Sequence, residues 1–438
     1  MSYIPSISFV TLGCAKNEVD SAEMKKRTVA AGFSLIEDPG KADAVVVNTC
    51  SFIQAATEES LEAIFDIAGM ENFSQGSAQL IVAGCMPARY GGDLASELPE
   101  AAGFVPCSKE DDIAEVLARL FPDFAMRGED TAIALDDECG VGGLPAALSA
   151  YVKISDGCDR FCSYCTIPFI RGRYHSYSLE EIKRSVAEQI AGGAREIVLI
   201  AQDTGRWGSD FETPSTLSAL IEQLAQTHQD TWFRVMYLQP EGITDELLDC
   251  VATHHNVCSY FDIPLQHIDS EILRAMNRRG SRAEYEALLA RIRSRVEKVT
   301  LRTTLIAGFP GETESAFEDL CGFLEEADFD YVGVFPYSRE EGTRAAEFAD
   351  QVDEETKLER AQTLRDIADT TSIARVAARI GSQREVLVLG VEEDDQLYGR
   401  AMCQAPDVDG VTYLTQGTVG EIRRVNIVDT LLYEMEGE

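Results

Sequence analysis

The chain has 438 residues, of which 45% are hydrophobic and 26% are charged, so it has the composition of an ordinary globular protein of about two to four domains. It carries 38 basic against 75 acidic side chains, a net charge of −37, and such a field attracts cations and repels nucleic acid. No apolar run reaches the roughly eighteen residues of a membrane-spanning helix, and the start MSYIPSISFVTLGC lacks the features of a signal peptide, so we expect a cytosolic protein without a membrane segment.

Residues 5–122 alternate between apolar, β-branched runs and amphipathic stretches. The runs ISFVTLGC, ADAVVVNTC and AQLIVAGC predict strands, and the stretches SAEMKKRTVAAGF and ATEESLEAIFDIAG predict helices between them. This βαβαβ order is typical of a parallel open sheet and predicts an N-terminal α/β domain.

Three of the twelve cysteines, Cys14, Cys50 and Cys85, each follow the carboxyl end of one of these strands. Parallel α/β sheets bind ligands at that edge, and cysteines in a cytosolic chain point to metal or redox chemistry more than to disulfides. Three cysteines at the same point of three successive units therefore predict a three-thiolate metal site. The alternative is three buried thiols, since free cysteine is among the most buried residue types.

Residues 123–143 are acidic and then rich in glycine, and we expect them to form a linker. Residues 144–381 carry helical stretches, among them SEILRAMNRRGSRAEYEALLARIRSRV and a long one at about 353–380, between six strand runs. The strand runs are AYVKISDGC, EIVLIAQD, WFRVMYLQP, YFDIPLQ, LRTTLIAGF and YVGVFPYS. Six βα units predict a partial TIM-like barrel, with its active site at the carboxyl rim of the strands.

Residues 382–438 change to short alternating strands, separated by turns such as Glu393-Asp394-Asp395 and Asp409-Gly410. About five such strands predict a small OB-like β-barrel. The expected fold class is therefore α/β, with an N-terminal open sheet, a central partial (βα)6 barrel and a C-terminal β-barrel.

A cysteine motif of spacing CxxxCxxC, formed by Cys158, Cys162 and Cys165, begins just after the first barrel strand, on the predicted rim. A closed structural zinc or iron–sulfur site takes four protein ligands, and the nearest further cysteine, Cys139, lies nineteen residues upstream. Three soft thiolates without neighbouring histidines favour an iron–sulfur cluster with one iron open to a small molecule; zinc is the alternative.

This motif resembles the signature of the radical S-adenosylmethionine superfamily, with the aromatic Tyr164 before the last cysteine. The resemblance implies that the open iron binds S-adenosylmethionine, whose reductive cleavage yields a 5′-deoxyadenosyl radical. Weaker matches imply cofactor contacts at Gly192 and Gly193, although Ala194 stands where the family has an acidic residue, and at Gly308 in LIAGFPGET. A glycine-rich turn alone more often reflects backbone geometry.

The order of the three domains resembles the methylthiotransferases of that superfamily over nearly the whole chain. The resemblance implies that the N-terminal three-cysteine site holds a second 4Fe-4S cluster, so that the cofactors are two 4Fe-4S clusters and S-adenosylmethionine. It also implies that the C-terminal barrel is a TRAM domain. The implied reaction is transfer of a methylthio group to an unactivated substrate carbon, with the cofactors supplying the difficult chemistry.

Two branches of this family differ in substrate: one modifies isopentenyl-adenosine in tRNA, and the other modifies the β-carbon of an aspartate in the strongly basic twelfth protein of the small ribosomal subunit. Residues 382–438 carry 4 basic and 12 acidic side chains, which suits a basic protein partner rather than RNA. The segments TLGCAKNEVDSAEM, NTCSFIQAATEES, CSYCTIPFIRGR, PLQHIDSEILRAMNRRGS and PYSREEGT also resemble the second branch, although His175 stands where an arginine is expected. We expect the ribosomal-protein branch and a monomer; tRNA is the alternative substrate.

Several polar residues at predicted strand ends are candidates for contacts with S-adenosylmethionine or substrate, and each is otherwise an ordinary turn residue. They are Gln202, predicted to contact the cofactor, and Asp203, Gln266, His267 and Arg339. The remaining cysteines are expected to be ordinary thiols: Cys107, Cys139, Cys250, Cys258, Cys321 and Cys403. A function of another class, a non-catalytic iron–sulfur carrier, stays open, although an electron carrier does not need a barrel.

Overall fold

The structure, a computed structural model, describes residues 3–126 and 147–438. Most of the linker expected at 123–143 therefore lies outside the described residues, as does Cys139. The described chain divides into two compact units. Unit 1 contains the N-terminal residues together with 156–159 and 165–174, and unit 2 contains 147–155, 160–164 and 175–438.

Unit 1 is built on a five-stranded parallel sheet of order β2-β1-β3-β4-β5. Its strands are β1 (Ser6–Thr11), β2 (Ser34–Leu35), β3 (Ala44–Thr49), β4 (Gln79–Gly84) and β5 (Gly103–Pro106). Its helices are α1 (Ala15–Ala30), α2 (Gln54–Ala68), α3 (Glu71–Ser74), α4 (Cys85–Tyr90), α5 (Leu94–Glu97), α6 (Ile113–Leu120) and α7 (Ile167–Ile170). The predicted parallel βαβαβ sheet is confirmed, and it gains the two short edge strands β2 and β5.

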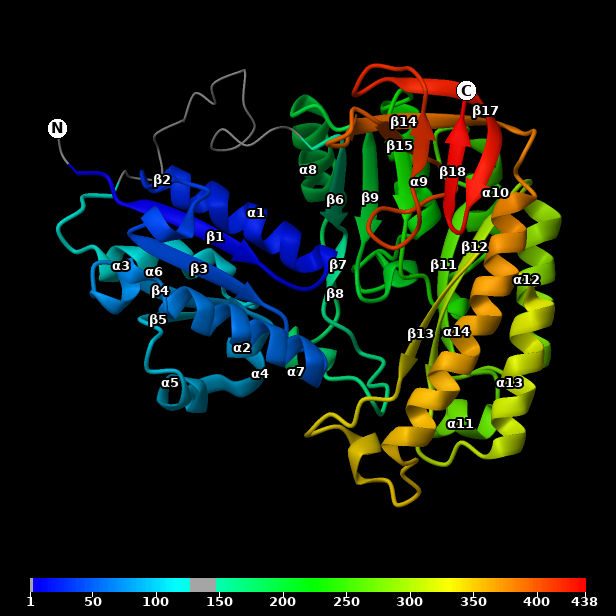
Figure 1. Cartoon of the computed structure of the whole chain (residues 1–438), viewed down its shortest axis with the longest axis horizontal. Coiled ribbons are helices and arrows are strands. Elements are labelled where there is room, and N and C mark those ends of the chain that lie inside the picture. Colours follow the sequence, from blue (N-terminus) through cyan, green and yellow to red (C-terminus); the bar gives the residue numbers. More distant parts are fainter. Residues whose placement is uncertain (1–2, 127–146) are drawn as a thin grey trace. The chain divides into compact units, whose positions relative to one another are not determined.

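The sheet of unit 1 is buried on both faces. Helices α1 and α6 cover one face, where Met24 packs against Ile81, and α2 and α5 cover the other, where Ile64 packs near Val82 (Figure 1). Because β3 lies in the middle, all six of its residues are buried, which explains its continuous apolar run. This packing fixes the carboxyl ends of β1, β3 and β4 next to one another.

Unit 2 contains two three-stranded parallel sheets, β10-β9-β6 and β11-β12-β13, and a backbone bridge between Phe233 and Val257 joins β10 to the segment before β11. The strands are β6 (Ser149–Lys153), β9 (Glu196–Ile200), β10 (Trp232–Val235), β11 (Tyr260–Gln266), β12 (Thr300–Ala307) and β13 (Tyr331–Pro336). The helices are α8 (Leu179–Ala191), α9 (Leu217–Thr227), α10 (Asp245–Thr253), α11 (Ser270–Ala275), α12 (Arg282–Arg295), α13 (Glu314–Ala327) and α14 (Glu354–Ala377). The predicted six-unit partial barrel is confirmed; the short strands β7 (Ser155–Asp156) and β8 (His175–Ser176) pair separately.

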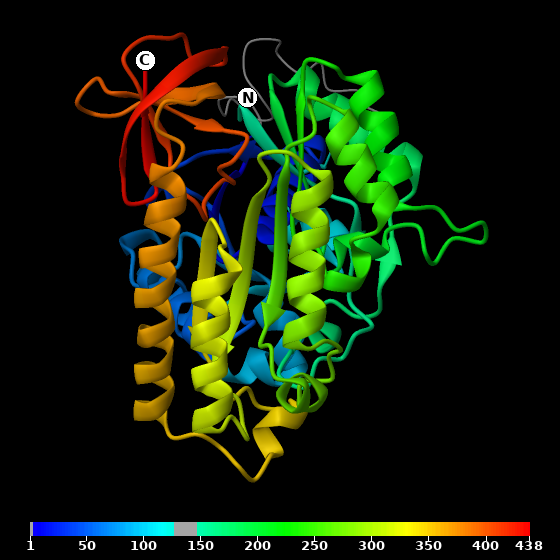
Figure 2. The same cartoon turned by 90° about the vertical axis from the view of Figure 1, so that its right-hand side faces the viewer.

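Helix α14 packs on β12 and β13 and lies beside α13, which in turn lies beside α12 (Figure 2). The single helical stretch expected over α11 and α12 is wrong. Asn277 has φ +60° and Gly280 has φ +139°, both outside the right-handed helical region. A Cβ on Gly280 would also lie 2.2 Å from the Tyr285 hydroxyl oxygen, so the chain turns sharply before α12.

The C-terminal part of unit 2 is a closed five-stranded barrel of order β14-β15-β16-β18-β17, as predicted. Its strands are β14 (Gln383–Val391), β15 (Leu397–Ala401), β16 (Thr412–Leu414), β17 (Ile422–Leu431) and β18 (Glu434–Gly437). Buried polar contacts join it to the parallel strands: Arg400 lies 2.6 Å from Glu196, and the Tyr260 hydroxyl donates to Asp409 over 2.7 Å. None of the helices in the described ranges is long and apolar enough to span a bilayer.

Candidate functional site

The three N-terminal candidate cysteines lie at the carboxyl ends of adjacent strands of unit 1. Cys14 follows β1 and directly precedes α1, Cys50 follows β3, and Cys85 follows β4. Cys14 is exposed, whereas Cys50 and Cys85 are buried. The sheet therefore brings the three thiols to one edge, with one of them open to solvent.

Two glycines permit this close approach. Gly13 has φ +95°, and a Cβ built on it would lie 2.5 Å from the Cys50 Cβ. Gly84 has φ +91°, and a Cβ on it would lie 2.2 Å from Asn48 Oδ1. Each glycine directly precedes a candidate cysteine, so the Gly-Cys pairs are required by backbone conformation and by space.

Asn17, fully buried at the start of α1, connects these strand ends. Its amide nitrogen donates to the Leu12 carbonyl over 2.9 Å and to the Thr49 carbonyl over 3.0 Å. Its amide oxygen lies 3.7 Å from the Cys85 sulfur. One side chain thus holds the ends of β1 and β3 in place beside the third cysteine.

The same amide oxygen accepts a hydrogen bond from Arg171 Nη2 over 2.9 Å. Arg171 also forms ion pairs with Asp20 over 2.7 Å and with Asp156 over 3.2 Å, and its side chain is 2% exposed. Although burial opposes the charge, the two carboxylates raise the pKa of Arg171 further above its ordinary value. A permanent buried cation therefore lies beside the N-terminal thiols.

Cys107, predicted to be an ordinary thiol, follows β5 and lies at the same edge. Its hydrogen bond to Cys85 lowers the pKa of Cys85 to about 7 against the effect of burial, and the charge of Arg171 lowers it further. The same bond, together with burial, raises the pKa of Cys107 far above its ordinary range. The only signal in the sequence was that Cys107, like the other three cysteines, follows a strand. Strand β5 has four residues, too few to show a strand pattern.

The N-terminal thiols share one electrostatic environment. Burial raises the pKa of Cys50 to about 11, and charge on Cys85 and Cys14 would raise it as well, since like charges repel. Across residues 3–126 and 147–438, no group of three or more His, Cys, Asp or Glu side chains is already gathered tightly enough to hold a metal ion. The donor set itself, three thiols beside a cation, suits a soft, anionic iron–sulfur group.

The CxxxCxxC motif divides between the two units. Cys158 is buried and belongs to segment 156–159 of unit 1, and the half-buried Cys165 belongs to segment 165–174 of the same unit. That second segment is attached within unit 1 by Arg171 and by the Thr166 hydroxyl, which donates to the Phe52 carbonyl over 3.1 Å. Cys162 lies on segment 160–164 of unit 2.

Segment 160–164 is anchored to unit 2 by its backbone and by Arg160. Arg160 Nε lies 2.5 Å from Asp203 Oδ2, and the Asp203 side chain is fully buried. The Asn277 amide donates to the carbonyls of Arg160 and Phe161, and the adjacent Arg278 donates to the Pro264 carbonyl over 2.7 Å. The turn between α11 and α12 therefore supports the central cysteine of the motif.

Unpaired polar atoms gather at the carboxyl ends of β9 and β10, the predicted rim. Gln202 Oε1, Asp203 Oδ1 and Gln239 Oε1 are buried and have no hydrogen-bond partner within the described chain. Buried acceptors normally find a partner, so these three are candidates for contacting a bound molecule. Gln202 and Asp203 were predicted; Gln239, which follows β10 in the same way, was missed.

The turn after β12 is held by a buried network. Gly308, with φ +71°, donates its N–H to Glu312 Oε1 over 2.9 Å. Glu312 also pairs with Arg360 over 2.8 Å, and its second oxygen lies 3.3 Å from His267 Nε2. Glu312 thus brings Gly308 and His267 together, and His267 supports the turn. Tyr164 stacks edge-on against Phe309 with ring centroids 6.4 Å apart.

Other predicted residues lie apart from this group. Gly192 and Gly193 end α8 and precede the amino end of β9, the end opposite to Gln202. Arg339 donates to the Ala346 carbonyl over 2.8 Å in the loop after β13. Gln266, at the end of β11, has φ +72° at a β-bulge, which is a structural feature of that strand.

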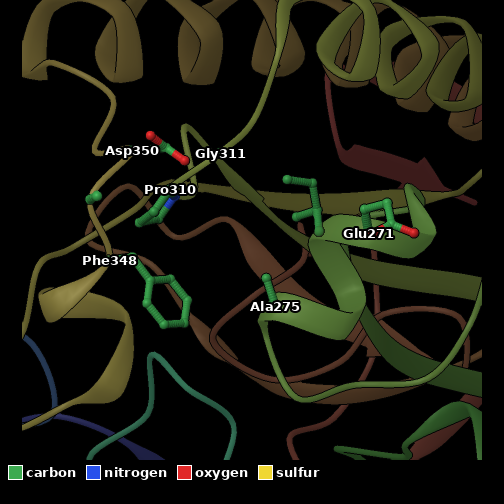
Figure 3. Close-up of a pocket in the computed structure, with 8 residues that line it drawn as sticks. Glu271, Ala275, Pro310, Gly311, Phe348 and Asp350 are labelled. Carbon is green, nitrogen blue, oxygen red and sulfur yellow. The ribbon is translucent and has the colours of Figure 1, made fainter.

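An open pocket of about 390 Å³ lies between the start of α11 and the turn after β12. Figure 3 shows Phe348 and Pro310 facing Ala275 across it, with Glu271 and Asp350 at its margins. No predicted site residue lines this pocket.

Comparison with protein families divides the chain as the fold does. Residues 6–106 match uncharacterized protein family UPF0004, residues 152–324 match the radical SAM superfamily, and residues 380–438 match the TRAM domain. The radical SAM match implies a 4Fe-4S cluster and S-adenosylmethionine as cofactors.

Solved structures with a similar fold include the radical S-adenosylmethionine methyltransferase TsrM from Kitasatospora setae, at 14% identity and a TM-score of 0.56, covering 75% of this chain and 72% of that chain. The cobalamin-dependent S-adenosylmethionine radical enzyme OxsB matches at 11% identity and a TM-score of 0.52, covering 83% of this chain and 56% of that chain. These likenesses concern the fold alone.

Curated relatives match along almost the entire sequence. Ribosomal protein uS12 methylthiotransferase RimO of Geobacter sulfurreducens is 42% identical over 438 residues, covering 99% of this chain and 98% of the relative. RimO of Trichlorobacter lovleyi is 41% identical over 440 residues, covering 99% and 97%. The predicted methylthiotransferase resemblance is confirmed, and the chain belongs to the ribosomal protein uS12 methylthiotransferase RimO family.

Proposed function

We propose that this chain transfers a methylthio group to the β-carbon of an aspartate in ribosomal protein uS12. The observation that carries the proposal is the match over 99% of the chain to relatives named for this activity. The chain retains both three-cysteine sets on which such chemistry would depend. The domain division that we propose is 5–122, a linker at 123–143, 144–381 and 382–438.

Cys158, Cys162 and Cys165 would hold the cluster that binds S-adenosylmethionine. Arg160, on the same loop, is fixed by Asp203, and this pairing supports an ordered loop before any cofactor binds. We propose cofactor contacts at Tyr164, Gln202 and Gly308. Gly192 and Gly193 are not included, because they lie at the amino end of β9.

The N-terminal cysteines Cys14, Cys50 and Cys85 would hold a second 4Fe-4S cluster. The fit rests on the chain's own residues: the three cysteines follow adjacent strands at one sheet edge, Cys14 is exposed, and Arg171 supplies a buried positive charge. When bound, the two clusters would supply electrons, S-adenosylmethionine cleavage and sulfur. The protein would position them and exclude water.

The C-terminal barrel would receive the substrate protein. Its 4 basic and 12 acidic side chains suit a basic partner, because complementary charge raises the association rate and orients the encounter. The same charge disfavours tRNA, the alternative substrate.

The test offers uS12 and isopentenylated tRNA in parallel to the chain reconstituted anaerobically with iron and sulfide, with reductant and S-adenosylmethionine. We expect mass spectrometry to find a methylthio group on an aspartate of uS12 only. Replacing Cys158, Cys162 and Cys165 by alanine should abolish S-adenosylmethionine cleavage, whereas replacing Cys14, Cys50 and Cys85 should leave cleavage and abolish methylthiolation. A modified adenosine would contradict the proposed protein substrate. If the intact chain did not cleave S-adenosylmethionine, an iron–sulfur carrier would be favoured.

A further inference from the structure

Two cysteines outside the CxxxCxxC motif, Cys85 and Cys107, directly follow the neighbouring parallel strands β4 and β5. The β4–β5 register pairs Ala83 with Val105 and Gly84 with Pro106, and the residues directly after these two strands are Cys85, the first residue of α4, and Cys107. The Cys107 N–H donates to the Gly84 carbonyl over 3.0 Å, so the backbone of Cys107 is held at the peptide group that joins Gly84 to Cys85.

Their spacing suits a covalent bond. Paired strands lie about 4.8 Å apart, and disulfides form when two Cα atoms are about 4.4–6.8 Å apart. The two cysteines belong to one small buried cluster with Ile170, whose carbonyl accepts a hydrogen bond from the Cys107 thiol over 3.4 Å. Little backbone movement would therefore be needed to join them.

The burial of Cys85 and Cys107 and the position of Cys14 also favour a bond between these two cysteines. Cys85 is 4% exposed and Cys107 is 8% exposed, so only a small oxidant reaches them without unfolding. Cys14, by contrast, is exposed and directly precedes α1, after the end of a different strand, β1. Asn17 Oδ1 contacts both the Cys85 sulfur and Arg171.

We infer that Cys85 and Cys107 form a reversible disulfide when the N-terminal site holds no cluster, and that this bond withdraws Cys85 from the metal-binding set. The oxidant is hydrogen peroxide. The Cys85 sulfur attacks one peroxide oxygen, the O–O bond breaks, and a sulfenic acid and one water form. The Cys107 sulfur then attacks the Cys85 sulfur, the S–S bond forms, the S–O bond breaks, and the second water leaves.

The overall change is two thiols and one peroxide giving one disulfide and two waters, and a dithiol reductant reverses it. The disulfide protects Cys85 from irreversible oxidation to sulfinic acid. It also leaves only Cys14 and Cys50 of the three N-terminal ligands, so the oxidised chain cannot load a cluster there. This second consequence rests on the proposed function of the N-terminal site; the disulfide itself does not.

The test uses the full chain, freed of metal by a chelator under argon and then exposed to hydrogen peroxide. Free thiols are blocked with N-ethylmaleimide, and digested peptides are mapped by mass spectrometry with and without dithiothreitol. We expect a linked peptide pair containing Cys85 and Cys107 that dithiothreitol separates. In Cys107→Ser, Cys85 should instead appear as sulfinic acid, about ten-fold more than in the unchanged chain.

Cys250→Ser is the matched control, because Cys250 is a buried thiol in α10 whose sulfur contacts the Ser218 carbonyl and His254. It should form the Cys85–Cys107 bond normally. Alkylation of both cysteines in the peroxide-treated chain, or a bond from Cys85 to Cys14 or Cys50, would overturn the inference. These outcomes are read in the unchanged chain, so they stand even if Cys107→Ser folds poorly.

Iron content separates this inference from the proposed function. The oxidised chain should bind iron at the CxxxCxxC motif only, and dithiothreitol should restore iron binding at the N-terminal cysteines. If the disulfide maps to Cys85 and Cys107 but iron loading is the same before and after reduction, the disulfide stands and the proposed N-terminal cluster is wrong.

Discussion

Arg171 Nη2 donates a hydrogen bond to Asp20 Oδ2 over 2.7 Å, and the two side chains are 2% and 0% exposed. The partners are 151 residues apart in sequence, one six residues beyond the CxxxCxxC motif and the other on the first helix. Within unit 1, this pair attaches the segment that carries Cys165 to helix α1, which directly follows Cys14.

Replacing Arg171 by glutamine should lower the free energy of unfolding by about 3–5 kcal/mol, because it leaves Asp20 and Asp156 charged and buried without their cation. Urea unfolding of the metal-free chain measures this. Arg173→Gln is the control, because the Arg173 side chain is 76% exposed and its pair with Asp159 should contribute less than about 1 kcal/mol. Equal effects of the two substitutions would contradict the role given to Arg171.

Gly84→Ala should destabilise the chain by about 3 kcal/mol and lower iron binding at the N-terminal cysteines, since the added Cβ would lie 2.2 Å from Asn48 Oδ1 and 2.7 Å from the Thr49 carbonyl. Iron per chain and urea unfolding measure the two effects. Gly76→Ala provides the comparison: Gly76 has φ +72° but nothing within 4 Å, so only the backbone cost of about 1 kcal/mol applies. Full iron loading in Gly84→Ala would refute the spatial argument.

Asp203→Asn should slow S-adenosylmethionine cleavage by about 10–100-fold, because Arg160 would lose the buried charge that fixes the loop between Cys158 and Cys162. Formation of 5′-deoxyadenosine measures the rate. Glu241→Gln removes the other partner of Arg160, but this carboxylate is 45% exposed and its pair is longer, at 3.1 Å, so a change below about three-fold is expected. An unchanged rate in Asp203→Asn would exclude Asp203 as a positioning residue.

The stability of unit 2 should depend on pH through Asp409. Burial raises the pKa of this carboxyl to about 6 from an ordinary 3.8, although Arg302 and the hydrogen bonds from Ala405 N–H and the Tyr260 hydroxyl oppose the shift. Between those two values the folded state binds more protons than the unfolded state, so the contribution of Asp409 to stability falls as pH rises and becomes constant above about 6.

Urea unfolding at pH 5.2 and pH 6.5 checks this against Asp409→Asn, which cannot titrate. The free energy of unfolding of the unchanged chain, relative to the variant, should fall by about 1 kcal/mol between these values. Both values lie above the pI of about 4.4, which keeps the chain soluble. A difference that is independent of pH would show that Asp409 is ionised throughout.

Much of the fold was predictable because it depends on patterns a few residues long. The β3 run is apolar at a central strand, where every residue is buried, and the alternation of strands and helices recovers the main strands of the three parallel sheets. The break between α11 and α12 was not predictable from that pattern, because Gly280 is needed only where the chain passes Tyr285.

The family, the order of the domains and the two sets of three cysteines could be predicted from the sequence, because spacing and hydrophobic period are properties of the chain as written. That Cys107 lies in one buried cluster with Cys85, and that Arg171 pairs with Asp20, became clear from the folded chain. Such neighbours depend on strand register and on long-range burial, where a charge or a thiol is retained only if a distant partner compensates its loss of water.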